Sequence, residues 1–99
     1  MAQYDVYAIS GSSDLFLELQ ANNVQGLSTK IGAPLIARGP FDRPIHRLQP
    51  EFDVGGRTYI MLTQHIFSIP ATDLKELRAN LIASDYRITS ALDLLFHGI

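Results

Sequence analysis

The apolar residues near the carboxyl end constrain this chain more than any other feature. Residues 84–96 predict a helix, with Ser84 as N-cap, Asp85 near the positive end of the dipole and Gly98 where a left-handed C-cap glycine belongs. At about 100° per residue, the apolar positions cover an arc of roughly 200° around the helix axis. This arc is about twice the width of the apolar stripe of a helix that packs against a single core. These positions are Ile88, Ala91, Leu92, Leu94, Leu95 and Phe96.

A helix with so wide an apolar arc needs cover on two sides, and a domain of 99 residues buries limited area. We therefore expect a homodimer across a two-fold axis. The expected interface residues are Ala91, Leu94, Leu95 and Ile99. The alternative is that the domain wraps the helix completely. Asp93 and His97, at i and i+4 on the polar side, are spaced so that their side chains can meet.

The first two thirds of the chain predict strands. They are Gln3–Ile9, Leu15–Gln20, Thr29–Ala37, Phe52–Val54, Arg57–Leu62 and His65–Ile69. The first two form an antiparallel hairpin, and Gly55-Gly56 is a strong signal for another, because both central turn positions need positive φ. Gly32 and Pro34 indicate a bend or an unpaired edge inside the third strand. Leu74, Leu77 and Leu81 favour a short helix over Ala71–Asn80. The expected class is a mostly β (α+β), small-barrel-like single domain, residues 1–99, with one C-terminal helix.

Composition and charge exclude several classes of function. The net charge is −2, without the basic stripe that direct nucleic-acid binding requires, so DNA contact is expected only indirectly, through a protein partner. There are no cysteines, and the three histidines lack metal-ligand spacing, so no metal or cofactor is expected. No apolar run is long enough to span a membrane, and Met1–Asp5 lacks the features of a signal peptide. We expect a cytoplasmic protein.

Several segments, in order and spacing, resemble one known family. The terminal ALDLLFHGI is similar to the ending of CcdB toxins from bacterial toxin–antitoxin pairs, in which a helix is followed by Phe-Trp-Gly-Ile. LFLELQ (15–20), PLI (34–36), MLTQ (61–64) and SIP (68–70) resemble further strands of that family. The likeness extends along nearly the whole chain.

The resemblance implies an SH3-like barrel with a C-terminal helix at a dimer interface, and a protein that performs no chemistry itself. It implies poisoning of DNA gyrase through the A subunit, with trapping of the cleaved DNA complex. It also implies a CcdA-type antitoxin whose disordered segment removes the toxin, and repression of the operon by the toxin–antitoxin complex.

By the same resemblance, His97, Gly98 and Ile99 correspond to the gyrase-binding residues. His97 departs from the family, where a tryptophan stacks on gyrase arginines; a histidine ring is smaller and, once protonated, repels a guanidinium. The antitoxin-binding residues correspond to Asn23, Val24, Asp93 and Phe96. Asn23 is apolar in the family, so a differently tuned antitoxin is expected.

Two alternatives remain from the residues. Asp42-Arg43-Pro44-Ile45-His46-Arg47 offers the acid, base and cation of an endoribonuclease, although a solvated charged loop explains it as well. His65, within a predicted strand, is interpreted as a strand-pairing or packing residue. The other alternative is a dimeric relative that binds an antitoxin and has lost gyrase poisoning, for which His97 is the main argument.

Overall fold

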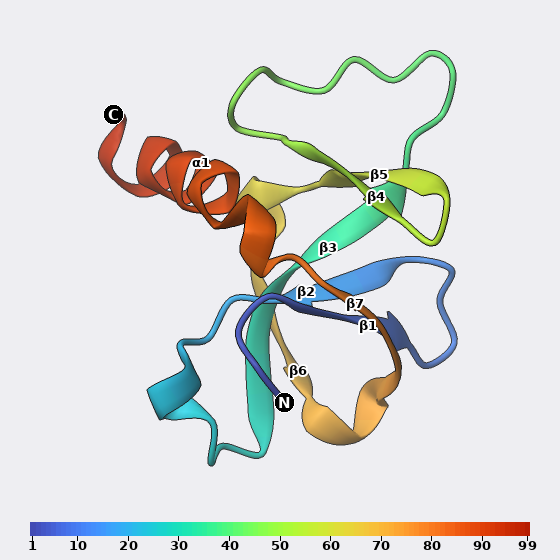
Figure 1. Cartoon of the computed structure of the whole chain (residues 1–99), viewed down its shortest axis with the longest axis vertical. Helices are drawn as coiled ribbons and strands as arrows, with labels where there is room; N and C mark the ends of the chain where they lie inside the picture. Colours follow the sequence, from blue (N-terminus) through green and yellow to red (C-terminus); the bar gives the residue numbers. More distant parts are fainter.

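The computed structural model describes all residues, 1–99, as one curled antiparallel sheet, a half-barrel, with a single C-terminal α-helix (Figure 1). The mostly β class with one terminal helix is therefore confirmed. The strands are β1 (Asp5–Ile9), β2 (Leu15–Glu18), β3 (Thr29–Ala37), β4 (Glu51–Val54), β5 (Arg57–Met61), β6 (Phe67–Pro70) and β7 (Leu74–Asn80), and the helix is α1 (Asp85–His97). Short 3₁₀ turns are η1 (Asn22–Val24), η2 (Thr63–His65), η3 (Ala71–Asp73) and η4 (Ile82–Ser84).

Strand β3 organises the sheet, whose order is β4-β5-β3-β2-β1-β7 with β6 also paired to β3. The first half of β3 pairs with β6 and its last three residues pair with β5, so the strand must bend between them. Gly32 lies at that bend, where a Cβ atom would clash with the Leu17 carbonyl oxygen and the Phe16 ring. Of the two alternatives predicted for this strand, a bend or an unpaired edge, the structure shows the bend (Figure 1), and glycine is required there by the close approach of β2.

Both predicted hairpins form. β1 and β2 pair antiparallel with Val6 opposite Leu17, and β4 pairs with β5 across the two-residue Gly55-Gly56 turn. Gly55 and Gly56 have φ of 60° and 82°, as this turn type requires.

The helix predicted over Ala71–Asn80 is wrong, because this segment forms η3 and then strand β7. The leucine spacing covers too few residues to stabilise a helix by itself, whereas β7 pairs antiparallel with β1 from Asn80 to Leu74, across two register shifts. The leucines do not form a buried stripe: Leu74 is buried and Leu77 is 60% exposed. The strand predicted from His65 also begins later, at Phe67, so His65 is an exposed residue of η2 and not a packing residue.

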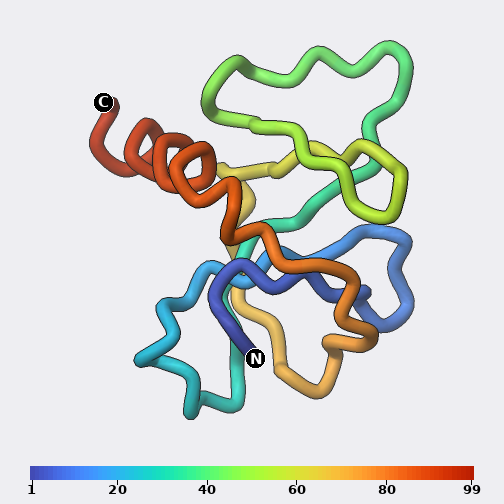
Figure 2. The backbone as a smooth tube through the Cα atoms, in the orientation of Figure 1, coloured from blue at the N-terminus to red at the C-terminus, as the bar shows by residue number.

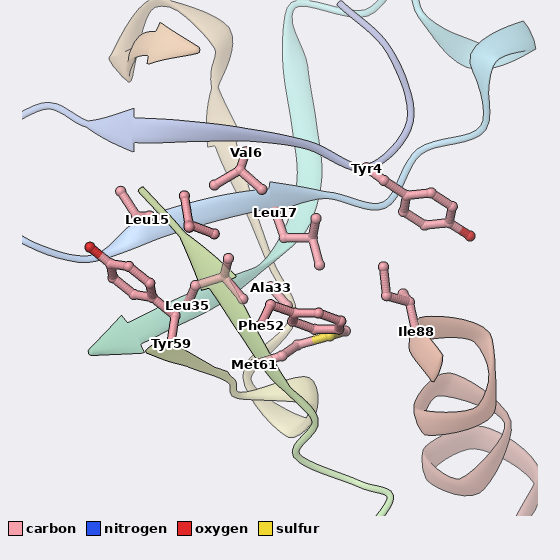
Figure 3. Packing of buried hydrophobic residues seen from close by; sticks show 11 residues of the cluster. Tyr4, Val6, Leu15, Leu17, Ala33, Leu35, Phe52, Tyr59, Met61 and Ile88 are labelled. Carbon is pink, nitrogen blue, oxygen red and sulfur yellow. The ribbon is translucent and has the colours of Figure 1, made fainter. Parts of the chain in front are cut away.

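The hydrophobic core has two parts, one on each face of β2. Leu15 and Leu17 face the larger cluster, and Ile88 of α1 closes that cluster (Figure 3). Phe16 faces the smaller cluster, where its ring meets Phe67 edge-on at 5.5 Å. The remaining members of the larger cluster are Tyr4, Val6, Ala33, Leu35, Phe52, Val54, Tyr59 and Met61.

Helix α1 meets the sheet near its first turns and then extends away from it, so that the C-terminus lies at a corner of the molecule (Figures 1 and 2). Tyr4 connects the helix start to the strands: its N–H donates to the Glu18 carbonyl at 2.8 Å, and its own carbonyl accepts from Leu81 N–H at 2.9 Å. Burial, together with the nearby Asp85 carboxylate, raises the pKa of the Tyr4 hydroxyl. No helix in the structure has the length and apolar character needed to cross a bilayer.

Candidate partner-binding site

The end of α1 exposes apolar side chains to solvent. Phe96 is 65% exposed and Ile99 is 77% exposed, and His97 between them is also exposed. Gly98 has φ of 71°, and its N–H donates to the Leu94 carbonyl at 3.0 Å, so the predicted left-handed C-cap is confirmed. Ser84 occupies the N-cap position, but its side chain makes no capping hydrogen bond.

The inner face of α1 is covered by its own sheet over a short length only. Ile88 and Ala91 are completely buried, Leu92 and Leu94 are half-buried, and Leu95 is 36% exposed. The sheet therefore does not wrap the helix completely, which was the alternative to a dimer. Among the residues predicted for the dimer interface, Ala91 needs correction: with no exposed surface left, it has none to offer a second subunit. Leu94, Leu95 and Ile99 remain available.

The polar side of α1 carries Asp93 and His97, which are both exposed. The chain's ion pairs are Arg38–Glu51 and Arg78–Glu76, so the side-chain contact expected between Asp93 and His97 does not form. The two side chains therefore make no contact with each other, and both are accessible to a partner.

The turn η1 carries the other two residues expected to bind an antitoxin. Asn23 is exposed and Val24 is 46% exposed, and Leu27 and Ile31 beside them are exposed as well. In Figures 1 and 2, η1 and the end of α1 lie at separate corners, so one protomer does not bring Asn23 and Val24 together with Asp93 and Phe96. The residues form two exposed surfaces.

A buried polar network beneath η1 fixes its conformation. The Gln20 amide donates to the Val24 carbonyl at 2.7 Å, and the Gln20 side-chain oxygen accepts from Ile31 N–H at 2.6 Å. Lys30, only 2% exposed, donates to both the backbone carbonyl and the side-chain oxygen of Gln25 at 3.0 Å. The Gln25 amide in turn donates to buried Glu18 at 2.6 Å. This network comprises Glu18, Gln20, Gln25 and Lys30, and it holds the backbone on which Asn23 and Val24 are displayed.

Sequence reasoning missed this network. Glu18 and Gln20 alternate with leucines in β2, a pattern that ordinarily indicates one face in solvent. Both faces of β2 are in fact buried. The available signal was the length of the polar segment that follows, since Gln25 and Lys30 are close enough in sequence to fold back over Glu18.

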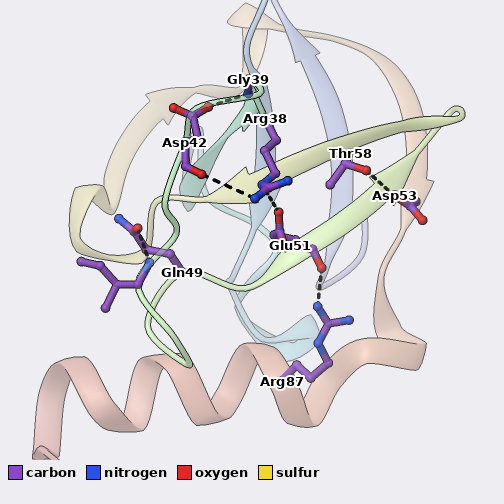
Figure 4. Close-up of polar contacts among 9 residues, drawn as sticks. Arg38, Gly39, Asp42, Gln49, Glu51, Asp53, Thr58 and Arg87 are labelled. Atoms are coloured by element: carbon purple, nitrogen blue, oxygen red, sulfur yellow. Dashed lines mark hydrogen bonds and ion pairs between the residues drawn. The ribbon is translucent and has the colours of Figure 1, made fainter.

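A second feature lies between the segment before β4 and the first half of α1, where the structure has a hollow of about 510 Å³. Arg87 of α1 reaches across to donate to the Glu51 carbonyl oxygen (Figure 4). Its guanidinium lies 4.6 Å from the centre of the Phe52 ring. The Glu51 carboxylate pairs with Arg38 at 2.6 Å. These contacts fasten α1 to the edge strand β4.

The residues considered for an endoribonuclease are divided between two neighbouring hollows. Asp42 and Arg43 line a separate hollow of about 150 Å³, whereas His46 and Arg47 line the larger one. The Asp42 carboxylate accepts a hydrogen bond from Gly39 N–H at 2.5 Å (Figure 4). This carboxylate therefore stabilises the conformation of its own loop. The acid and the base therefore line different hollows, whose walls share Pro44 and Gln49.

The fold and its exposed elements define a small half-barrel protein that presents one helix end and one turn to partners. A family model described as CcdB protein matches residues 3–98, and the chain belongs to the CcdB family. Membership of this family indicates a toxin of a toxin–antitoxin system. No curated protein matches the chain.

One similar solved structure is an endoribonuclease in complex with its cognate antitoxin from a mycobacterial species. It has a TM-score of 0.64 and 16% sequence identity, and the alignment covers 94% of this chain and 89% of that one. At this identity the likeness shows the fold.

Proposed function

We propose that this protein is a toxin that poisons DNA gyrase, by binding the A subunit with His97, Gly98 and Ile99 and trapping the enzyme while its DNA is cleaved. The observation that carries the proposal is the end of α1, where Phe96 and Ile99 are exposed and the Gly98 cap sets the direction of the last residue. Such a surface suits insertion into a partner because it combines apolar area with a rigid, hydrogen-bonded backbone.

The toxin acts as a homodimer. Leu94, Leu95 and Ile99 lie along α1 on the length that its own sheet leaves uncovered, and a two-fold axis there would bury them while bringing two helix ends side by side. Two adjacent ends match a target that is itself a dimer. Binding alone is sufficient for this action, so we propose that the protein is not an enzyme.

A CcdA-type antitoxin neutralises the toxin and, together with it, represses the operon. The two candidate surfaces, Asn23 with Val24 and Asp93 with Phe96, lie at separate corners of a protomer. An extended, flexible peptide can contact both surfaces at once. A compact domain could do so only if its own surface were complementary to both. The antitoxin in the complex of the similar endoribonuclease structure agrees with a partner of this class.

The direct test is incubation of the purified protein with gyrase, ATP and supercoiled DNA, followed by denaturation of the enzyme. We expect double-strand breaks that increase with toxin concentration. Because His97 replaces a larger aromatic ring, His97→Trp should raise the yield of cleaved DNA, and Ile99→Asp should abolish it without unfolding the protein, since Ile99 makes little contact with its own chain.

The outcomes separate the alternatives. Absence of breaks with both the natural protein and His97→Trp would refute gyrase poisoning. If RNA were then digested, the endoribonuclease would be correct. If neither nucleic acid were cut and an antitoxin still bound, the protein would be a non-toxic member of the family.

A further inference from the structure

The hollow between the segment before β4 and α1 has the size and charge of a ligand site that the proposed toxin action does not use. Its volume of about 510 Å³ falls within the range of about 300–1,000 Å³ typical of small-molecule sites. It lies near the start of α1, away from the helix end and from η1. The residues that matter for its chemistry are His46, Arg47, Glu51, Tyr86, Arg87 and Ser90.

Two arginine side chains are held in place at this hollow. Arg47 adopts a φ of 67°, unusual for a residue other than glycine, and its Nε donates to the Ser90 hydroxyl at 2.7 Å. Arg87 is fixed by its hydrogen bond to the Glu51 carbonyl and by stacking on the Phe52 ring. Arg87 and Ser90 are one turn apart on α1 and share a face, so both guanidinium groups border the same space.

Neither of these arginines is neutralised. The chain forms two ion pairs, Arg38–Glu51 and Arg78–Glu76, and neither includes Arg47 or Arg87. The one carboxylate in the wall of the hollow, Glu51, is the partner of Arg38 at 2.6 Å. The hydrogen bonds to Ser90 and Glu51 leave further N–H donors on both guanidinium groups. A local excess of positive charge therefore stands in a protein whose net charge is −2.

We propose that this hollow binds the phosphate group of a small phosphorylated molecule of about the size of a nucleoside monophosphate. Paired guanidinium groups suit a phosphate dianion because several N–H donors can face its oxygens at once. The space exceeds the volume of a phosphate ion, so an organic part fits beside it. Tyr86, which is 75% exposed at the rim, offers an aromatic face to that part.

The test is a titration of the purified protein with inorganic phosphate and with adenosine 5′-monophosphate at constant ionic strength, followed by NMR of backbone amides. We expect saturable shifts at Arg47, Arg87 and Ser90, and tighter binding of the monophosphate. Arg47→Gln and Arg87→Gln should each lower the affinity tenfold or more, as loss of a hydrogen bond to a charged group predicts.

The matched control is Arg57→Gln, because Arg57 is also exposed but lies on the β4–β5 hairpin, outside the hollow. It should bind both phosphates like the natural protein. Arg87 also packs on Phe52, so Arg87→Gln could lower the stability of the fold. A thermal melt of this variant therefore measures its stability alongside its phosphate affinity. Arg47 makes one side-chain contact at the surface, so Arg47→Gln remains decisive if Arg87→Gln is destabilised.

Three results would overturn the proposal. The first is the absence of saturable binding by either phosphate. The second is equal weakening of binding in Arg57→Gln, which would mean unspecific charge attraction. The third is Arg47-dependent binding of a single-stranded RNA or of an acidic peptide that neither phosphate displaces, which would make the hollow part of a macromolecular interface. The assay contains no gyrase and no antitoxin, so its result is independent of the toxin proposal.

Discussion

Replacing Ile88 with alanine tests how α1, the element that carries the proposed recognition end, is held on the sheet. Ile88 is the large side chain of α1 that is completely buried, and it packs into the cluster that contains Tyr4, Phe52 and Met61 (Figure 3). Its replacement removes three buried carbon atoms, and at about 0.8 kcal/mol each the lost hydrophobic free energy is about 2.4 kcal/mol. The cavity left behind adds about 1 kcal/mol, so we expect a loss of about 3–4 kcal/mol in the free energy of unfolding.

Phe96→Ala is the matched control, since it removes a larger side chain from the same helix at a position that is 65% exposed. We expect it to cost less than about 1 kcal/mol. Urea unfolding followed by circular dichroism at several protein concentrations measures both, because a dimer makes stability concentration-dependent. The reasoning is refuted if Ile88→Ala costs less than about 1 kcal/mol, or if Phe96→Ala costs as much as Ile88→Ala at every concentration.

Three further predictions concern other parts of the fold. Gly32→Ala should destabilise the protein by about 2 kcal/mol or more, because the added Cβ would meet the Leu17 carbonyl oxygen and the Phe16 ring. Gly26→Ala, with open space around the added Cβ, should change the stability by no more than about 0.5 kcal/mol. Equal shifts of the melting temperature in the two variants would contradict this expectation. Burial raises the pKa of Asp5, but hydrogen bonds from Asn80, Ala2 N–H and the Tyr7 hydroxyl outweigh it, and the net pKa lies below 3.8. The carboxylate therefore stabilises the fold above that value and loses its contribution as the pH falls through the lower folded pKa, so Asp5→Asn should flatten the acid limb of the stability–pH curve; an unchanged limb would count against it. Lys30→Met should remove the support of the turn at Val24, so we expect faster hydrogen exchange at the Val24 amide and a several-fold weaker complex with the antitoxin. Lys30→Arg should largely restore both the slow exchange and the affinity. Unchanged exchange in Lys30→Met would show that the turn needs no such support.

Much of the fold follows from local sequence signals. The Gly55-Gly56 turn and the C-cap at Gly98 are positions where the backbone itself requires glycine, so short-range chemistry is sufficient to place them. Gly32 marks the bend of β3, but the reason for glycine there is the tertiary approach of β2. The segment before Asn80 was misassigned for the opposite reason. Its leucine spacing is a weak local preference, and pairing with β1, more than sixty residues earlier in the chain, overrides it.

The candidate sites divide in the same way. The wide apolar arc of α1 predicted uncovered hydrophobic surface, and the exposure of Leu95, Phe96 and Ile99 agrees with it. The burial of Ala91 could not be predicted, because helical periodicity gives the direction of a side chain and not the distance over which the sheet follows the helix. The support beneath Val24 and the placement of Asp42 and His46 in different hollows likewise depend on where loops lie in space.

The sequence by itself determined the strand–turn pattern, the amphipathic terminal helix and the family to which the chain belongs, because each depends on residues close together or on their order. Only the tertiary structure decided which polar residues are buried and which charges are left without a partner. Glu18 and Lys30 became an internal support, whereas Arg47 and Arg87 became an unneutralised pair at a hollow. The physical reason is that solvation and ion pairing depend on the surroundings of a charge, and these surroundings come from segments distant in sequence.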